Sequence, residues 1–208
     1  MIEMMGYQGK AVVVTGAASG MGQATAELLG ELGAEVFALD IAPVTVPVTR
    51  SMAVDIKDAA SIDAAVAELP ERIFALFNSA GVPSPPFNAR DTLLINFVGL
   101  RYLTESLLPR IEDGGSIASI ASTAGMAWKP GLDSVNAFLA QDSAFSAAEK
   151  WMDANPQACV DGYGFSKQCI IVYTMAMART LAQRNVRINC ISPSPTASAF
   201  MDTLKGEG

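Results

Sequence analysis

Residues 10–22 read KAVVVTGAASGMG, an apolar, β-branched run followed by a glycine-rich turn. The run is typical of a buried parallel strand. After the turn, Ala24, Leu28 and Leu32 recur at helical spacing, so a helix is expected to begin near Gly20. Strand, glycine-rich turn and helix together predict a phosphate-binding loop, because N–H groups at a helix N-terminus bind anions and glycines let a pyrophosphate approach closely.

The glycines of this loop differ in spacing from the common dinucleotide fingerprint. Three residues rather than one separate the first two glycines, so a plain tight turn stays an alternative. On the binding interpretation, the residues expected to contact a cofactor here are Gly16, Ser19, Gly20, Met21 and Gly22.

The next expected strand, residues 35–40, ends in Asp40, about 20 residues beyond the loop. A carboxylate at that point can accept hydrogen bonds from the adenosine ribose hydroxyls, and it would repel a 2′-phosphate. The loop residues Ala17, Ala18 and Ser19 offer no arginine or lysine to bind such a phosphate. The pattern therefore favours NAD over NADP. The alternative is a solvated aspartate at the end of a strand.

Strands and helices alternate along the rest of the chain. Further strands are expected near 51–55, 73–77, 116–121 and 186–191, and helices near 59–69, 91–111 and 162–184, with Gly114 and Gly115 ending the second of these. This order predicts an α/β fold, a Rossmann-type doubly wound parallel sheet with helices on both faces, in a single domain over residues 1–208.

Ligands bind open parallel sheets at the carboxyl ends of the strands. Six segments follow expected strand ends and should converge on one edge of the sheet. They are 16–22, Asp40, Asp55, 78–81, Ser122 and 192–196.

Tyr163 and Lys167 lie four residues apart in an expected helix, which places both side chains on one helical face. The lysine charge favours the phenolate form of the tyrosine, and such a pair can exchange a proton with an alcohol or a carbonyl oxygen. Taken alone, the same spacing also describes an ordinary surface pair.

Composition excludes several classes of function. The chain has a net charge of -7 and no histidine. A nucleic-acid interface would need a basic face, and hydrolases of the Ser-His-Asp type and histidine-ligated metal catalysis would need histidine. We therefore expect no nucleic-acid partner and no metal. No uninterrupted apolar stretch of about 18 residues and no signal peptide is evident, so no membrane association and a cytoplasmic location are expected.

Taken in order, these motifs resemble the short-chain dehydrogenase/reductase family over essentially the whole chain. The loop at 15–22 is similar to its cofactor loop, and Asn78-Ser79-Ala80-Gly81 to its Asn-Asn-Ala-Gly motif. Residues 115–122 resemble the strand that leads to its catalytic serine, and Tyr163 and Lys167 its Tyr-x-x-x-Lys pair. Residues 192–196 resemble its Pro-Gly segment, with Ser194 at the usual glycine position.

The resemblance implies roles for these residues. Tyr163 would be the general acid/base, Lys167 would assist it and hold the nicotinamide ribose, and Ser122 would stabilise charge on the substrate oxygen. Asn96 would hold a water that relays the proton past Lys167 to solvent. The implied chemistry is hydride transfer between substrate carbon and nicotinamide. The implied cofactor-binding set is completed by Asp55, Ile56, Asn78, Ala80, Gly81, Pro193 and Thr196, together with Tyr163 and Lys167.

Two departures from the family pattern stand out. The segment from Ser122 to Tyr163 is unusually long and contains an apolar insert at about 128–161, similar to the insert of 3α-hydroxysteroid dehydrogenase/carbonyl reductases and coniferyl alcohol dehydrogenases. The insert is expected to line the substrate pocket or form a subunit contact, or else to be a surface hairpin. The family also continues past residue 208 through a lid and a last strand, so a truncated chain is expected.

The resulting hypothesis is an NAD-dependent alcohol dehydrogenase or ketone reductase that assembles as a homodimer or homotetramer. The apolar insert suggests a bulky substrate, either a hydroxysteroid or an aromatic alcohol. The alternative from another class is a sensor or scaffold protein that binds NAD without turnover, since a fold does not fix a function. The intact set of Asn96, Ser122, Tyr163 and Lys167 argues for the enzyme.

Overall fold

A computed structural model describes residues 6–196. A parallel sheet of six strands forms its centre, in the order β3-β2-β1-β4-β5-β6. The strands are β1 (Ala11–Thr15), β2 (Glu35–Asp40), β3 (Arg50–Ala53), β4 (Ile73–Asn78), β5 (Ile111–Ile120) and β6 (Arg187–Ile191). Strands β1 to β3 are added towards one edge of the sheet, and β4 to β6 are added towards the other edge. The crevice for a ligand is therefore expected where this order switches, at the carboxyl ends of β1 and β4.

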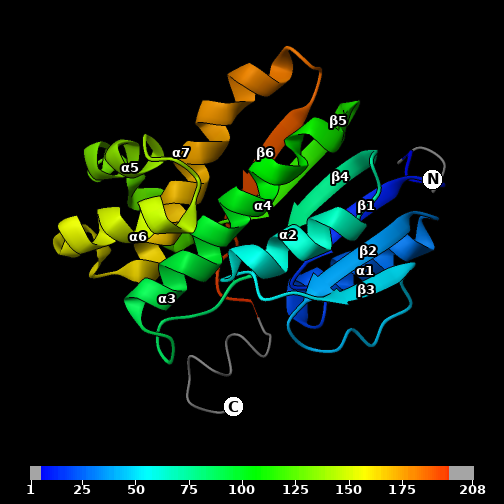
Figure 1. The fold of residues 1–208 in the computed structure, drawn as a ribbon, viewed down its shortest axis with the longest axis horizontal. Helices are drawn as coiled ribbons and strands as arrows, with labels where there is room; N and C mark the ends of the chain where they lie inside the picture. Colours follow the sequence, from blue (N-terminus) through cyan, green and yellow to red (C-terminus); the bar gives the residue numbers. More distant parts are fainter. Residues whose placement is uncertain (1–5, 197–208) are drawn as a thin grey trace.

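Helices lie on both faces of the sheet (Figure 1). They are α1 (Gly20–Glu31), α2 (Ala59–Glu68), α3 (Ala89–Leu93), α4 (Leu100–Leu107), α5 (Leu132–Leu139), α6 (Phe145–Ala154) and α7 (Gly162–Ala182). Shorter helical segments are the π-helical turn η2 (Leu94–Gly99) and the 3-10 turns η3 (Leu108–Arg110), η4 (Thr123–Trp128) and η5 (Pro156–Cys159). The predicted doubly wound α/β fold is confirmed.

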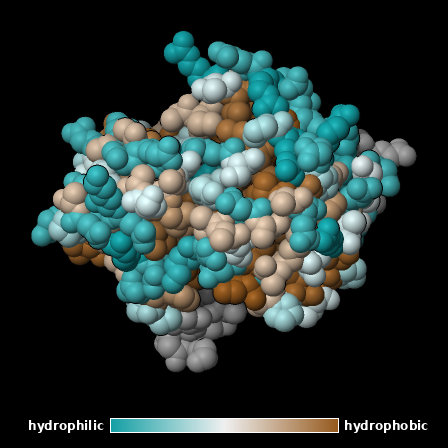
Figure 2. Space-filling view, viewed as in Figure 1, coloured by the Kyte–Doolittle hydropathy of each residue, from teal (hydrophilic) through white to brown (hydrophobic). Residues whose placement is uncertain are grey.

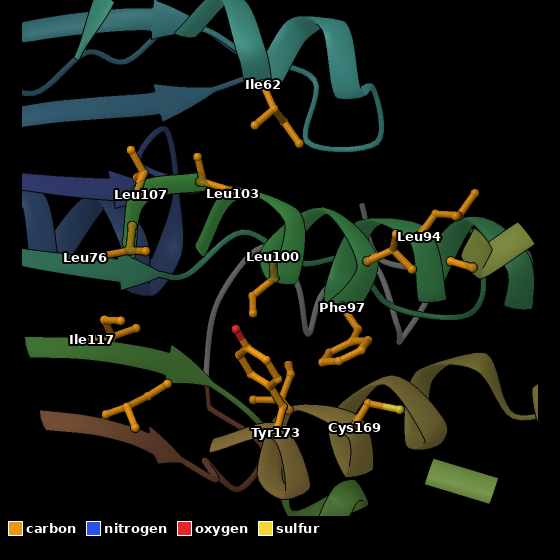
Figure 3. Packing of buried hydrophobic residues seen from close by; sticks show 14 of the residues in the cluster. Ile62, Leu76, Leu94, Phe97, Leu100, Leu103, Leu107, Ile117, Cys169 and Tyr173 are labelled. Carbon is orange, nitrogen blue, oxygen red and sulfur yellow. The ribbon is translucent and has the colours of Figure 1, made fainter. Parts of the chain in front are cut away.

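Strand alternation divides the core between the two faces of the sheet. On β1, Val12 and Val14 face α1, whose Ala26 and Leu29 are buried against them. Val13 faces the opposite side and joins the larger cluster formed with α2, α4 and α7. Figure 3 shows the centre of this cluster, where the rings of Phe97 and Tyr173 meet at 5.9 Å between centroids.

The expected elements agree with the structure except around residues 91–116. The expected long helix is interrupted by the π-helical turn η2, and it gives way to β5 at Ile111 rather than at Gly114 and Gly115. Both glycines lie inside β5. Gly114 has a φ of +85°, and the register against β4 shifts nearby. The glycine pair therefore marks an irregularity in a strand, not the end of a helix.

The insert between Ser122 and α7 folds as α5, α6 and η5. Its apolar side chains point inward: Phe138 and Trp151 are buried, and Phe138 lies 5.9 Å from Phe97 and 5.8 Å from Phe165 between ring centroids. Figure 2 shows mainly hydrophilic residues over the part of the molecule where α5 and α6 lie. The insert therefore buries Phe138 and Trp151 in the core.

None of the helices between residues 6 and 196 combines the length and apolar character that a membrane crossing requires.

Candidate active site

A cavity of about 880 Å³ lies at the carboxyl ends of the strands. Segments that follow β1, β2, β3, β4, β5 and β6 all contribute to its lining, as the sequence predicts. Of the expected site residues, those that line it are Gly16, Ser19, Gly20, Met21, Gly22, Asp40, Asp55, Ile56, Ala80, Gly81, Ser122, Tyr163, Lys167, Pro193 and Thr196.

The glycine-rich loop lies tightly against the turn after β4. Gly16 has a φ of +68°, and a Cβ atom there would lie 2.7 Å from the Cα of Ala80. Thr15 fixes the same contact, since its Oγ1 accepts hydrogen bonds from the N–H groups of Ser79 and Ala80, both at 3.0 Å. The loop and the 78–81 turn are thus held together beneath the cavity.

Helix α1 begins directly at the cavity. Its N-cap, Ser19, makes no side-chain capping hydrogen bond, and the first-turn residues Gly20, Met21 and Gly22 line the cavity. Uncapped N–H groups and the helix dipole favour an anion at this point. A Cβ atom on Gly20 would enter open space, while one on Gly22 would lie 2.0 Å from the Gly16 carbonyl oxygen. Gly22 therefore permits the close packing of the loop on its own helix.

Asp40 lies at the end of β2 with its carboxylate held in place. One oxygen accepts the N–H of Ala18 and the other the N–H of Ala42, each at 2.9 Å. Each oxygen keeps a further lone pair for a hydroxyl group. Among the described residues that line the cavity, Lys167 is the only cation, and it comes from α7 rather than from the loops beside Asp40.

Lys167 is buried, and its Nζ donates a hydrogen bond to the Ile120 carbonyl at 2.8 Å. Burial lowers the pKa of this ammonium to about 8, because a charged group loses its hydration there. The Nζ lies 5.6 Å from the centroid of the Tyr163 ring. The expected Tyr–Lys pair is thus adjacent, on one face of α7.

Ser122 stands where β5 ends and η4 begins. Its Oγ accepts the N–H of Ala124 at 3.2 Å, which leaves the hydroxyl proton available to a ligand. Gly125 brings this segment against α7, because a Cβ atom there would lie 2.7 Å from the backbone carbonyl group of Lys167. Ser122, Tyr163 and Lys167 therefore line one end of the cavity together.

Two expected site residues do not line the cavity. Asn78 is buried, and its Nδ2 donates to the Thr104 hydroxyl at 2.9 Å and towards Ser119 at 3.3 Å. Asn96 is fully buried in η2. Its side chain pairs with the backbone of Val82, accepting from the N–H at 2.7 Å and donating to the carbonyl at 3.0 Å. Through these hydrogen bonds, both residues stabilise segments that adjoin the cavity lining.

The cavity also has apolar lining that the sequence motifs did not identify. Val82, Phe87 and Ile95 contribute on the β4 side, and Ile41 follows Asp40. Phe87 lies in the proline-rich loop after β4, and its position after a strand end was the available signal. No described residue of the insert, 128–161, lines the cavity. Among residues 6–196, no cluster of cysteine, aspartate or glutamate suits a metal ion.

Known proteins are similar to this chain in sequence and in fold. The family model described as short chain dehydrogenase matches residues 10–134 and 152–207. The residues between the two matched ranges, 135–151, lie inside the insert. The chain is similar to a coniferyl-alcohol dehydrogenase from Pseudomonas sp., with 34% identity over 93% of this chain and 75% of that protein.

Solved structures share the fold. A 3-alpha-hydroxysteroid dehydrogenase from Pseudomonas sp., in complex with NADH, aligns with a TM-score of 0.77 and 22% identity over 94% of this chain and 76% of that one. A short chain dehydrogenase from Burkholderia cenocepacia, in complex with NADP, aligns with a TM-score of 0.70 and 22% identity over 93% and 77%. Both cofactors thus occur on this fold.

Proposed function

The chain belongs to the short-chain dehydrogenase family of oxidoreductases, and from this premise we propose that it transfers a hydride between NAD and an alcohol or ketone. The observation that carries the proposal is the convergence of Ser122, Tyr163 and Lys167 at one end of a cavity whose other parts suit a dinucleotide. A protein that only bound the cofactor would have no need of this proton-transfer set.

The described residues fit a dinucleotide. The cavity volume of about 880 Å³ falls within the roughly 300–1,000 Å³ of small-molecule sites. The start of α1 suits a pyrophosphate, and the open space at Gly20 leaves room for it. The carboxylate of Asp40 suits the two hydroxyls of an adenosine ribose. These residues would hold the cofactor, with Lys167 and Tyr163 beside its nicotinamide end.

Asp40 supports NAD rather than NADP. A 2′-phosphate beside its carboxylate would place two negative charges together, which is unfavourable unless a cation neutralises one of them. Among the described lining residues, no arginine or lysine lies in the glycine loop or after β2.

The proposed mechanism divides the reaction between cofactor and protein. The bound nicotinamide would supply or accept the hydride. In alcohol oxidation, Tyr163 takes the hydroxyl proton as the carbon–oxygen bond becomes a carbonyl, and it returns the proton in the reverse direction. Ser122 donates a hydrogen bond to the same oxygen and stabilises charge that develops there. The Lys167 ammonium stabilises negative charge on the phenol oxygen during the transfer.

Asn96 has a positioning role in this proposal. Its side chain holds Val82, and so fixes the start of the loop after β4. The water relay that the family resemblance implies for Asn96 stays a prediction.

The substrate is proposed to be a bulky alcohol or ketone, either an aromatic alcohol or a hydroxysteroid. The aromatic side chains of the insert, which first suggested this, pack on η2 and α7 instead of lining the cavity. Support comes now from the apolar lining by Val82, Phe87 and Ile95, and from the names of the two Pseudomonas relatives. A homodimer or homotetramer in the cytoplasm remains part of the proposal.

The test is NADH formation by the purified chain, given NAD or NADP and a panel of cyclic, steroid and cinnamyl-type alcohols. Tyr163→Phe is expected to lower kcat by about 10²–10⁴-fold, the usual contribution of a general acid/base, with NADH binding and melting temperature unchanged. Tyr102→Phe is the matched control, because its hydroxyl donates to the exposed Asp63 and neither residue lines the cavity. Tight NADH binding without any turnover would instead indicate a sensor or scaffold protein.

A further inference from the structure

Phe87 is an exposed aromatic side chain in a cavity. Its side chain is 41% exposed although the residue is large and hydrophobic. Met21 and Ile41 are the other large exposed hydrophobic residues that line the cavity among those described. Met21 lies at the start of α1, which is expected to hold the pyrophosphate, and Ile41 follows Asp40, which is expected to hold the adenosine ribose. Phe87 instead follows β4, and so needs a separate explanation.

The backbone around Phe87 is fixed at both ends of its loop. At the start, Asn96 holds both polar groups of the Val82 backbone. At the end, Asn88 caps α3, with its Oδ1 accepting the Asp91 N–H at 2.8 Å. Within the loop, the Ser84 hydroxyl donates to the Phe87 carbonyl at 2.9 Å. A fixed backbone presents the ring without the entropy cost of ordering a mobile loop on binding.

The same loop adjoins the catalytic helix. A Cβ atom on Gly162 would lie 2.1 Å from the carbonyl oxygen and 2.5 Å from the Cα of Ala89. The backbones of α3 and α7 therefore touch at this point. Phe87 stands two residues before Ala89, Tyr163 stands one residue after Gly162, and both side chains line the cavity. Phe87 and Tyr163 thus reach the cavity from adjacent backbone segments.

Few of the described residues that line the cavity are charged. Val82 and Ile95, which also follow β4 in the sequence, line the cavity as well, and Lys167 is the only lining cation among the described residues. The described acids of the lining, Asp40 and Asp55, follow β2 and β3. A substrate group that reaches Phe87 would therefore be neutral and apolar. An aromatic ring gains more there than a saturated ring of equal size, because edge-to-face or offset stacking adds to burial.

We propose that Phe87 determines substrate specificity by stacking on an aromatic ring of the alcohol substrate. This rests on the proposed dehydrogenase function and narrows its substrate class from bulky ring compounds to neutral arylalkyl or cinnamyl-type alcohols. The hydroxyl of such a substrate lies at Ser122 and Tyr163, and its ring extends towards the loop at 82–88.

The experiment compares cinnamyl alcohol with its saturated-ring counterpart, (E)-3-cyclohexylprop-2-en-1-ol, in wild type, Phe87→Leu and Leu28→Ala. Leu28 is an exposed hydrophobic residue of α1 that does not line the cavity, and serves as the control. Phe87→Leu keeps an apolar side chain but removes the π face. It is expected to lower the wild-type ratio of kcat/KM values, aromatic over saturated, by roughly two- to tenfold, the range for an aromatic pair. Affinity for NADH should not change.

If Phe87→Leu leaves the aromatic-over-saturated ratio of kcat/KM values unchanged, the proposed stacking contact is wrong. Turnover of these alcohols by wild type would still support the dehydrogenase function. If wild type shows no turnover at all, the dehydrogenase function fails. The stacking contact is then measured directly, by calorimetric titration of cinnamamide into the NADH complex. Binding weakened roughly two- to tenfold in Phe87→Leu, but not in Leu28→Ala, would support the contact, and equal binding to all three would overturn it.

Discussion

At the scale of single residues, Lys167 combines a charge with near-complete burial. Burial lowers the pKa of Lys167 from an ordinary 10.5 to about 8. Between those values the unfolded chain binds more protons than the folded one, so the free energy of unfolding rises with pH across this window. The variant Lys167→Met has no titrating group at this position. The free energy of unfolding of wild type should therefore rise, relative to that of Lys167→Met, by at most about 3 kcal/mol between pH 8 and 10.5.

Urea unfolding of both proteins at several pH values, without cofactor, measures this difference. Other titrating groups cancel because both proteins contain them. Lys150→Met, an exposed lysine of α6, controls for the loss of a lysine elsewhere. A difference between wild type and Lys167→Met that stays constant from pH 7 to 10.5 would contradict the effect assigned to burial.

Asp40 is expected to set the preference for NAD. Asp40→Asn removes the charge but keeps an acceptor for the backbone N–H groups of Ala18 or Ala42. The ratio of kcat/KM for NADP over NAD should rise by about tenfold or more, because a like-charge contact that costs at least ~1.4 kcal/mol is lost. Steady-state kinetics with both cofactors checks this. Glu35→Gln, at the opposite end of β2, should leave the ratio unchanged.

Much of the site was predictable at this scale because motif residues follow strand ends. The direction of each side chain was not. Asn78 belongs to a recognisable motif, yet as the last residue of β4 it points towards Thr104 and Ser119 and not into the cavity. Phe87 belongs to no motif, and its placement depends on the contact between Ala89 and Gly162, which links distant parts of the chain.

At the scale of elements, the π-helical turn η2 is the feature that periodicity could not show. Leucine and phenylalanine recur across 91–111 as in an ordinary helix, but one wider turn shifts the residues of Leu94–Gly99. Gly99 lies at the end of this turn, where a Cβ atom would be 1.9 Å from the Ile56 carbonyl oxygen. The turn therefore packs directly on the segment after β3, whose Asp55 and Ile56 line the cavity.

Gly99→Ala is expected to lower the free energy of unfolding by about 1–3 kcal/mol, as overpacking does, and to weaken NADH binding by displacing Ile56. The matched control is Gly30→Ala in α1, where a Cβ atom would meet its nearest neighbour at an ordinary 3.7 Å. That control should stabilise the protein by about 0.4–1 kcal/mol through helix propensity and a less flexible unfolded chain. Denaturant unfolding and NADH titration distinguish them, and equal stability of the two variants would refute the packing assigned to Gly99.

At the scale of the whole molecule, the insert extends the core away from the site. Phe138 of α5 and Trp151 of α6 lie 4.7 Å apart between centroids, and the Trp151 ring stacks on Phe165 of α7 at 5.9 Å. Composition alone predicted an apolar insert, but not the face on which it would be buried. That depends on the spacing of Phe97, Phe165 and Tyr173 on η2 and α7, which only the folded arrangement brings together.

This arrangement separates stability from cofactor binding. Phe138→Ala should lower the free energy of unfolding by about 3–5 kcal/mol, the usual cost of removing a buried aromatic ring. The Kd for NADH of the folded fraction should stay unchanged, because no described residue of the insert lines the cavity. Met126→Ala, at a side chain that is 66% exposed, should change stability by no more than about 0.5 kcal/mol. Urea unfolding followed by far-UV circular dichroism, with NADH fluorescence titration at low urea, measures both quantities. Binding of NADH that weakened in proportion to the lost stability would show instead that the aromatic cluster holds the catalytic end of α7 in position.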